Sequence, residues 1–479
     1  MGYQILAIAI YFVVLITIGF ASYRGHKSAT DFIIGGRSMN YWLTALAAHA
    51  SDMSSWIFMG YPSVVFSGGM IQAWAAIGLI TFMLLNWMIV APKVRIATEQ
   101  YNSLTFSSFF ESRLADTTGR IRVFTALMSM FFYTIYISAA LVGLGILLEM
   151  LFGVQYDIGI IIGIIIVIPY VFIGGYHTLA WIDLFQGIFL LLVIVFVPLY
   201  LLSSVGGFDG IHRALTMKDL SAKLIPDFST HTFKEIFYMF AGWGVGYFGQ
   251  PHIITKFMGI RKVSEIPKAK WIGMTWMVMS LSAATLVGLL GCAFFTEGLK
   301  QPELVFIEMV HDMFHPFIVG FILCAVLAAT INAMSSQVLV LSSNLTEDFY
   351  KKLLRPKASS KELLIISRLG VILVTLIAYV IAFVKPISIY TLVLYAWSGL
   401  GSSFGPLLLL SLYSKKINKY GAWTGILLGG SSAAVWPYIN DYLDQDIPSL
   451  LPGFILSFLA IIVVSYLTQS KSDPDISSI

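Results

Sequence analysis

Two carboxylic acids, Asp52 and Asp183, lie within long apolar stretches of the sequence. In a bilayer such a group costs about 2.5–3.5 kcal/mol on insertion scales, which makes each one a candidate for function. His49 stands three residues before Asp52 and would share its helical face, as a hydrogen-bond partner or a proton-sensitive group. Asp183 is also compatible with a helix entry that faces interfacial water or the helix dipole. Asp52 is therefore the stronger candidate.

A polar stretch at residues 332–337 (NAMSSQ), followed by 342–344 (SSN), offers hydroxyl and amide oxygens inside another apolar segment. Serine hydroxyls in membrane helices often bond to their own helix or join neighbouring helices, so a structural role is equally open. Hard oxygen donors on two or three helices, without a thiolate or histidine cluster, suit an alkali cation better than a transition metal.

Four aromatic residues, Trp56, Tyr136, Trp243 and Tyr247, accompany these polar groups. Most aromatic residues of membrane proteins belong to the interfacial belts or to packing. Those beside unwound backbone can instead enclose a small solute with apolar and charged parts, with a ring face toward an ammonium group.

Transmembrane helices are the elements that must position these residues. The chain has 479 residues, of which 58% are hydrophobic and only 11% charged, with a net charge of +4 and a mean hydropathy of +0.84. Globular domains carry about a quarter charged residues, and continuous apolar runs favour membrane helices over a β-barrel. This composition argues against disorder, nucleic-acid binding and a disulfide scaffold, so Cys292 and Cys324 are expected to be buried bystanders.

Thirteen spans can be drawn. The first apolar run, residues 6–21, follows four uncharged residues and leads into a basic loop, so we expect a retained span and not a cleaved signal peptide. Each further segment is near the about 20 residues that a bilayer requires. These segments are 41–66, 71–91, 123–151, 157–176, 180–204, 236–258, 271–295, 316–345, 364–384, 387–412, 421–438 and 450–468.

An odd number of spans places the termini on opposite faces of the membrane. The loops on one face carry 22 Lys and Arg residues, against six on the other, and the remaining one, Lys256, lies near a helix end on the first face. The positive-inside rule then predicts an N-terminus outside and a C-terminus in the cytoplasm. The basic loops are those at 22–40, 92–122, 259–270, 346–368 and 413–420, together with the tail.

The spacing of the spans repeats. Spans two to six start about 193–207 residues before spans seven to eleven, which gives two blocks of five at 41–205 and 236–412. Because five is odd, the second block enters the membrane from the opposite side, as in the inverted repeats of secondary transporters. Residues 1–40 and 413–479 would then be peripheral, and 206–235 an extracellular loop.

Both blocks begin with a segment that is poor material for a continuous helix. The first contains residues 49–56 (HASDMSSW) and the second 242–251 (GWGVGYFGQP). Interrupted helices at matching positions indicate a transport site, because free carbonyls can hold a cation and helix N-termini can face an anionic group. Close helix packing through small residues is the alternative explanation.

The sequence resembles the sodium:solute symporter family at residues 51–56 (SDMSSW) and 242–252 (GWGVGYFGQPH), and the likeness extends over about residues 10–468. Such proteins have thirteen spans and a five-plus-five inverted core, as the spacing indicates. Further similar motifs are 34–38 (IGGRS), 172–175 (FIGG), 343–350 (SNLTEDFY) and 395–399 (YAWSG).

The resemblance implies a set of site residues. It implies a sodium site on backbone carbonyls of Ala50, Met53 and Ala329, with Asp52, Ser54 and Asp183 shaping the ion path. The implied solute contacts are Trp56, Tyr136, Trp243, Tyr247, Gln250 and Pro251.

This chain departs from the family pattern at the ion site. The family normally supplies two adjacent hydroxyls on the ninth span, where this sequence has Asn332 and Ala333. His49 also replaces a small residue. Sodium would then be held with fewer donors, aided by Ser335 and Ser336, or a proton would provide the coupling.

The function that the resemblance implies is import of L-proline, or a close amino-acid analogue, coupled to inward sodium flow across a bacterial-type plasma membrane. Proton coupling, and a sodium symporter for another amino acid, a sugar or a carboxylate, are the alternatives. A channel would not need two matched interruptions, and a sensor would need a signalling domain after the last span. An enzyme would need a nucleophile–base or metal pair, which the scattered histidines do not provide, and no obligatory protein partner is evident.

Overall fold

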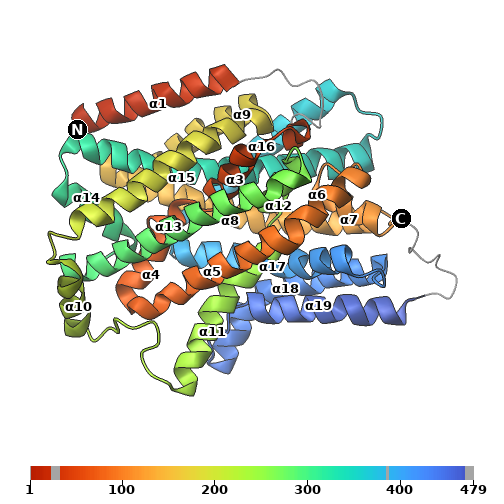
Figure 1. Ribbon diagram of the computed structural model, residues 1–479. Helices are drawn as coiled ribbons and strands as arrows, with labels where there is room; N and C mark the ends of the chain where they lie inside the picture. The colour runs from red at the N-terminus through yellow and green to blue at the C-terminus, as the bar shows by residue number, and fades with distance from the viewer. Residues whose placement is uncertain (1, 23–32, 385–387, 470–479) are drawn as a thin grey trace.

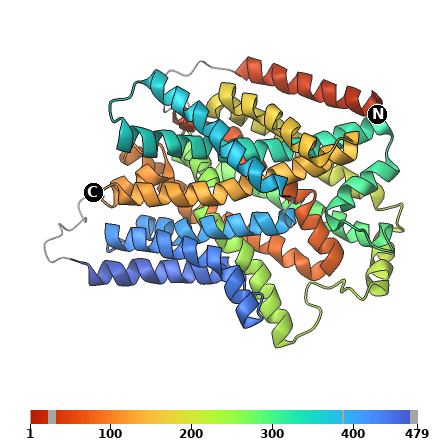
Figure 2. The ribbon, with the colours of Figure 1, turned by 180° about the vertical axis from the view of Figure 1, so that it is seen from behind.

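The computed structural model of this chain describes residues 2–22, 33–384 and 388–469, and these form a bundle of helices (Figures 1 and 2). No β-strand occurs in those residues beyond one isolated bridge between Met39 and Ile260. Nine helical segments of the described chain are long and apolar enough to cross a membrane. The all-helical membrane architecture expected from composition is thus confirmed. The nine segments are Gly2–Ser22, Met70–Gln100, Arg120–Phe152, Tyr176–Leu201, Val263–Phe294, Pro316–Lys352, Lys361–Phe383, Ile389–Tyr413 and Leu450–Leu467.

The first predicted interruption is present. Helix α3 (Tyr41–Ala50) ends before Asp52, and the chain resumes with a short 3-10 turn, η2 (Ser55–Ile57), and helix α4 (Gly60–Gly68). At the break the Ser51 hydroxyl donates to the Ala47 carbonyl at 2.5 Å, and the Ser54 hydroxyl accepts from the Trp56 backbone N–H at 3.3 Å. Serine side chains compete with the helix for backbone groups in this way, which explains why the helix stops here.

The second predicted interruption is also present. Helix α11 (Thr230–Gly244) passes into a 3-10 segment, η5 (Val245–Gly249), and helix α12 (Pro251–Gly259) then begins. Gln250 between them is extended, with φ −92° and ψ 103°. Proline disfavours a helical residue before it and is well placed at the start of a helix, so the Gln250–Pro251 pair sets this break.

Helix α9 (Tyr156–Leu201) differs from the prediction. The sequence predicted two spans, 157–176 and 180–204, but the structure has 46 residues of continuous helix here. Since about 20 residues cross a bilayer, α9 is more than twice the length of one span. The total of thirteen spans therefore stays a prediction.

The first helix and the last two pack on the rest of the bundle. Helix α1 (Gly2–Ser22) lies against α9 and α15 (Pro316–Ser343), while α18 (Lys419–Leu443) and α19 (Leu450–Leu467) pack on each other. Helix α1 begins at one end of the bundle and α19 ends at the other (Figure 1), as an odd number of crossings requires. The basic loop predicted at 22–40 and the tail lie largely outside the described residues, and both cysteines are buried and free.

Two glycines allow α11 to approach α5 (Ala73–Leu85) closely beside the second interruption. A Cβ atom added at Gly244 would lie 2.3 Å from the Phe82 ring and 2.8 Å from the Gly78 carbonyl oxygen. The Gly78 backbone of α5 cannot move aside as a flexible side chain could, so this contact fixes the distance between α11 and α5.

We predict that Gly244→Ala destabilises the protein by about 1–3 kcal/mol, the usual effect of overpacking. Gly19→Ala is the control, because its Cβ would meet only Ile182 at an ordinary 3.8 Å. Thermal unfolding of both variants in detergent measures the difference. Equal unfolding midpoints would show that α5 and α11 do not need this close approach.

Candidate functional site

Asp52 joins the two interrupted helices. The Tyr247 hydroxyl, from η5, donates to its Oδ2 at 2.5 Å, and His252 Nε2, from α12, lies 3.7 Å from its Oδ1. Asp52 is 6% exposed, and both partners are fully buried. The breaks therefore face each other, and a buried carboxylate connects them.

His252 is held by α8 (Arg120–Phe152). Its backbone N–H donates to the Tyr133 hydroxyl at 2.9 Å, and the same hydroxyl lies 3.0 Å from His252 Nδ1. A hydroxyl that accepts the N–H has its own proton free for Nδ1, which leaves Nε2 to carry the imidazole proton toward Asp52. Tyr136 meets the His252 ring edge-on, with centroids 6.2 Å apart. Sequence reasoning assigned no role to His252 or Tyr133, although His252 ends the most distinctive motif.

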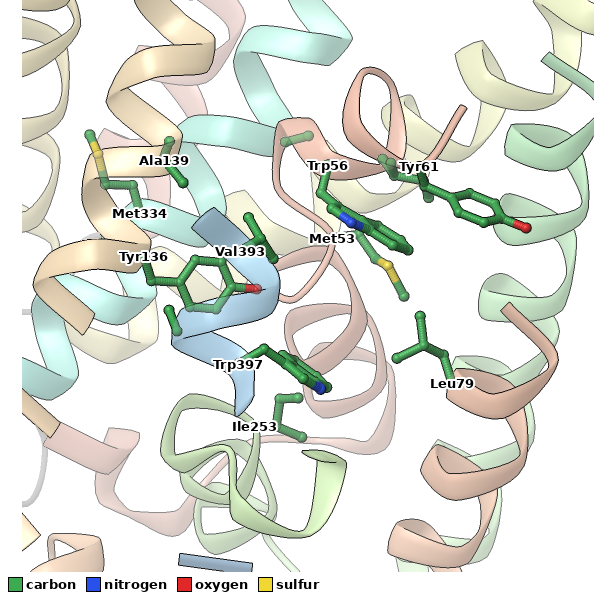
Figure 3. Close-up of a cluster of buried hydrophobic side chains, with 14 of the residues drawn as sticks. Met53, Trp56, Tyr61, Leu79, Tyr136, Ala139, Ile253, Met334, Val393 and Trp397 are labelled. Carbon is green, nitrogen blue, oxygen red and sulfur yellow. The ribbon is translucent and has the colours of Figure 1, made fainter. Parts of the chain in front are cut away.

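An aromatic group lies beside Asp52. The Trp56 ring is 5.0 Å from both the Tyr61 and the Trp243 ring, and Trp243 Nε1 donates to the Tyr390 hydroxyl at 2.8 Å. Figure 3 shows Met53 and Trp56 of the first break in the same region as Tyr136 and Trp397, which come from two other helices. Tyr136, Trp56, Trp243 and Tyr247, which the sequence singled out, are thus brought into one region.

Trp397 of helix α17 (Ile389–Tyr413) ties this group to the second break. Its Nε1 donates to the Trp243 carbonyl at 2.9 Å, and its ring meets Tyr247 edge-on at 5.0 Å. The amide nitrogen of Gln250 donates to the carbonyls of Gly246 and Trp397, both at 3.1 Å. Gln250 Oε1 is buried without a partner, so it is available to a donor on a bound molecule.

Helix α15, which carries the polar stretch, packs against α3 and η2, the elements on either side of the first break. Both amide atoms of Asn332 and the Ser335 hydroxyl are buried without a hydrogen-bond partner. Buried oxygens of this kind normally have a partner, and a bound cation would supply one. Ala50, Met53 and Ala329, whose carbonyls complete the predicted sodium site, are buried as well.

Asp183 and Ser336 are already engaged. Lys256 Nζ of α12 donates to Asp183 Oδ2 at 3.1 Å and to the Ser336 hydroxyl at 3.3 Å. Sequence reasoning placed Lys256 at a helix end and left open a water-facing helix entry for Asp183. That interpretation of Asp183 is wrong, because it is 2% exposed and lies inside the continuous helix α9.

His49 does not serve Asp52 through its side chain. The prediction assumed one helical face, but α3 ends at Ala50 and the chain turns away before Asp52. His49 Nε2 instead accepts from Trp87 Nε1 at 3.2 Å, and its ring packs against Trp87 and Trp276. The side chain of His49 therefore packs against Trp87 and Trp276 instead of pairing with Asp52.

Access to the site differs at the two ends of the bundle. A surface cavity on one side has Trp243 and Tyr390 in its wall, together with His231, Lys234, Glu235 and acidic residues of the α18–α19 connection. At the other end, Arg122 binds Glu111 at 2.7 Å and Asp348 at 3.6 Å, while Lys352 binds Glu111 at 3.2 Å. These ion pairs connect α7 (Phe106–Arg113), α8 and the π-helical segment η8 (Asn344–Leu354).

Comparison with known proteins identifies relatives over the whole chain. The model of the sodium:solute symporter family matches residues 32–429. The chain is 40% identical over 462 residues to the high-affinity proline transporter PutP of Bacillus subtilis (strain 168), covering 96% of this chain and 97% of the relative. It is also 40% identical over 480 residues to the sodium/proline symporter of Staphylococcus aureus (strain COL), covering 96% of this chain and 92% of that one.

Solved structures share the fold. A Na+-coupled sialic acid symporter in a substrate-bound outward-open state superposes with a TM-score of 0.83 at 16% identity, over 98% of both chains. MhsT in complex with L-phenylalanine gives a TM-score of 0.58 at 16% identity, over 89% of this chain and 97% of that one.

We predict that Asp52→Asn and Tyr247→Phe are energetically coupled. Hydrogen bonds to charged groups contribute about 1.5–3 kcal/mol, so the two variants should deviate from additivity by about 1 kcal/mol or more. Unfolding of the single and double variants in detergent measures the coupling. Tyr395→Phe is the control partner, because its hydroxyl bonds to the Ala434 carbonyl instead. Additive effects for Asp52 and Tyr247 would contradict the link.

Proposed function

The chain belongs to the sodium:solute symporter family, and from this membership we propose that it is a secondary active symporter that imports L-proline with a sodium ion. Support for proline as the solute comes from the relatives whose names state it, at 40% identity over nearly the whole chain. Support from the geometry comes from one observation: two interrupted helices meet at a buried carboxylate beside an aromatic enclosure.

The proposed solute site lies between the breaks. An apolar ring suits the aromatic walls of Trp56, Trp243 and Tyr136, and a ring face attracts the amino group of a zwitterion. Gln250 Oε1, which is unpartnered, can accept from that same amino group. Tyr247 and Pro251 complete the wall on the side of the second break, and this assignment covers all six residues that the family resemblance implied.

The proposed sodium site lies between the first break and α15. The carbonyls of Ala50, Met53 and Ala329 would bind the ion, and Asn332 Oδ1 and the Ser335 hydroxyl would replace the two missing hydroxyls of the family pattern. Asp52 would balance the charge of the ion, and Ser54, whose hydroxyl accepts from the Trp56 backbone, would keep the break open.

Coupling to sodium gives the transporter its driving force. Proline is neutral overall, so one positive charge enters per cycle, which yields about 2.3 kcal/mol at 100 mV and about 1.4 more from a tenfold gradient. Together these permit about 500-fold accumulation. The cation must bind the outward-facing arrangement more tightly, since equal affinity for both arrangements shifts nothing. We propose that the ion does this by bridging the first break and α15.

The same proposal includes the topology. The blocks 41–205 and 236–412 would rock against each other around the site, with the N-terminus outside and the C-terminus in the cytoplasm of a bacterial cell. Proton coupling is the second candidate, and the observation that favours it is His252, whose Nε2 faces Asp52 at 3.7 Å.

We predict that replacing sodium with choline, at fixed pH and voltage, abolishes proline accumulation in proteoliposomes. Asp52→Asn should also abolish it, because the cation loses its balancing charge. Uptake that persists in choline under an imposed pH gradient would assign the coupling to protons. In that case His252→Gln, and not His49→Gln, should remove it.

We predict that Trp243→Ala weakens proline binding at least tenfold, which corresponds to about 1.4 kcal/mol, because it removes the aromatic wall and its link to Tyr390. Trp271→Ala is the matched control, since Trp271 is 63% exposed whereas Trp243 is 4% exposed. Competition binding with labelled proline on purified protein measures both affinities. Unchanged affinity in Trp243→Ala would place the solute elsewhere.

A further inference from the structure

We propose that the ammonium group of Lys256 is a built-in cation, which permanently fills a second cation position at Asp183 and Ser336. This inference rests on the proposed function, because it divides the predicted ion residues into two sets. Asn332 and Ser335 would serve the exchangeable ion, and Asp183 and Ser336 would serve the lysine.

The contacts of Lys256 are those of a bound cation. Its Nζ donates to a carboxylate at 3.1 Å and a hydroxyl at 3.3 Å, and it lies 5.0 Å from the centre of the Tyr176 ring. Lys256 and Ser336 are each 3% exposed, and Asp183 is 2% exposed. Two elements, α9 and α15, therefore surround the ammonium group that α12 carries, with oxygen atoms and a π face.

The position relates directly to the candidate sodium site. Ser335 and Ser336 lie three and four residues after Asn332 on α15, so both share one face of the helix with Asn332. Asn332 and Ser335 are buried without partners, and Ser336 is satisfied by Lys256. One face of α15 thus carries two sets of oxygen donors: Asn332 and Ser335, which have no partner, and Ser336, which is bonded to Lys256.

The surroundings of the pair distinguish it from a sealed structural ion pair. A small cavity adjoins the pair, and its lining includes Tyr176, His252, Lys256 and Ser336, together with Ser343, Asn344 and Thr105. A buried carboxylate without its partner charge is strongly unfavourable. Removal of the ammonium should therefore leave a negatively charged position that a small cation can reach and occupy.

The consequence is a change in ion stoichiometry. The natural chain would exchange ions only at the site with Asn332 and Ser335, because the ammonium group of Lys256 is part of the chain and cannot leave the Asp183 site. Lys256→Met would turn the position beside Asp183 and Ser336 into an exchangeable site. The variant would then bind about one more sodium ion per chain than the natural protein. Lys256→Arg keeps the charge and should bind no additional ion.

The test is equilibrium binding of radioactive sodium to the purified full chain in detergent, without solute. Lys256→Met should exceed the natural protein by about one ion, and Lys256→Met with Asp183→Asn should lose that gain, because no unpaired carboxylate remains. If Lys256→Met unfolds in sodium-free buffer, sodium and not choline should restore its unfolding midpoint.

The proposal is overturned if folded Lys256→Met binds no more sodium than the natural chain, or if Lys256→Arg shows the same gain as Lys256→Met. Failure of the proposed function gives a different result. If protons drive uptake, the natural chain binds no sodium, yet the difference between the natural chain and Lys256→Met still decides the role of the lysine.

Discussion

Asp52 carries a carboxylate into the interior of the bundle, where a tyrosine hydroxyl and an imidazole face it from another helix. A buried charge is tolerated only when hydrogen bonds or an opposite charge compensate it. Here neither partner carries a full positive charge when His252 is neutral. The protein alone therefore compensates the charge of Asp52 only in part. The interrupted helices, the aromatic group and α15 are arranged around this partly compensated carboxylate.

The two buried carboxylates make the contrast clear. Asp183 is met by a lysine from its own chain, whereas Asp52 is met only by polar groups. The same α15 helix serves both, with Ser336 beside the lysine and Asn332 and Ser335 unpartnered. A site that must bind and release an ion cannot be fully satisfied without it, so the unpartnered oxygens are consistent with function and not with poor packing.

The sequence predicted the parts that depend on local chemistry. Proline after glutamine, and serines beside an aspartate, act on their own neighbours, and both breaks occur where these residues are. The partners of Asp52 could not be predicted in this way, because Tyr247 and His252 are about 200 residues away and only the folded chain brings them near. His49 was misassigned for the same reason: helical spacing applies only while the helix continues. Lys256 was placed near a helix end because the sequence shows its charge but does not show that Asp183, 73 residues away, is its partner.

The difference between the two ends of the bundle has a consequence for how each end opens. On one side, the wall of the surface cavity includes two aromatic side chains, Trp243 and Tyr390, that are joined by one hydrogen bond. On the other side, ion pairs hold three separate helical elements together. Exposed side chains change rotamer within nanoseconds and packed helices shift over microseconds to milliseconds, but Trp243 is only 4% exposed and its rotation is tied to its packing. Opening at the aromatic side would thus require two side chains to move, whereas opening at the opposite end would require ion pairs between three elements to separate, so the two ends open through different motions.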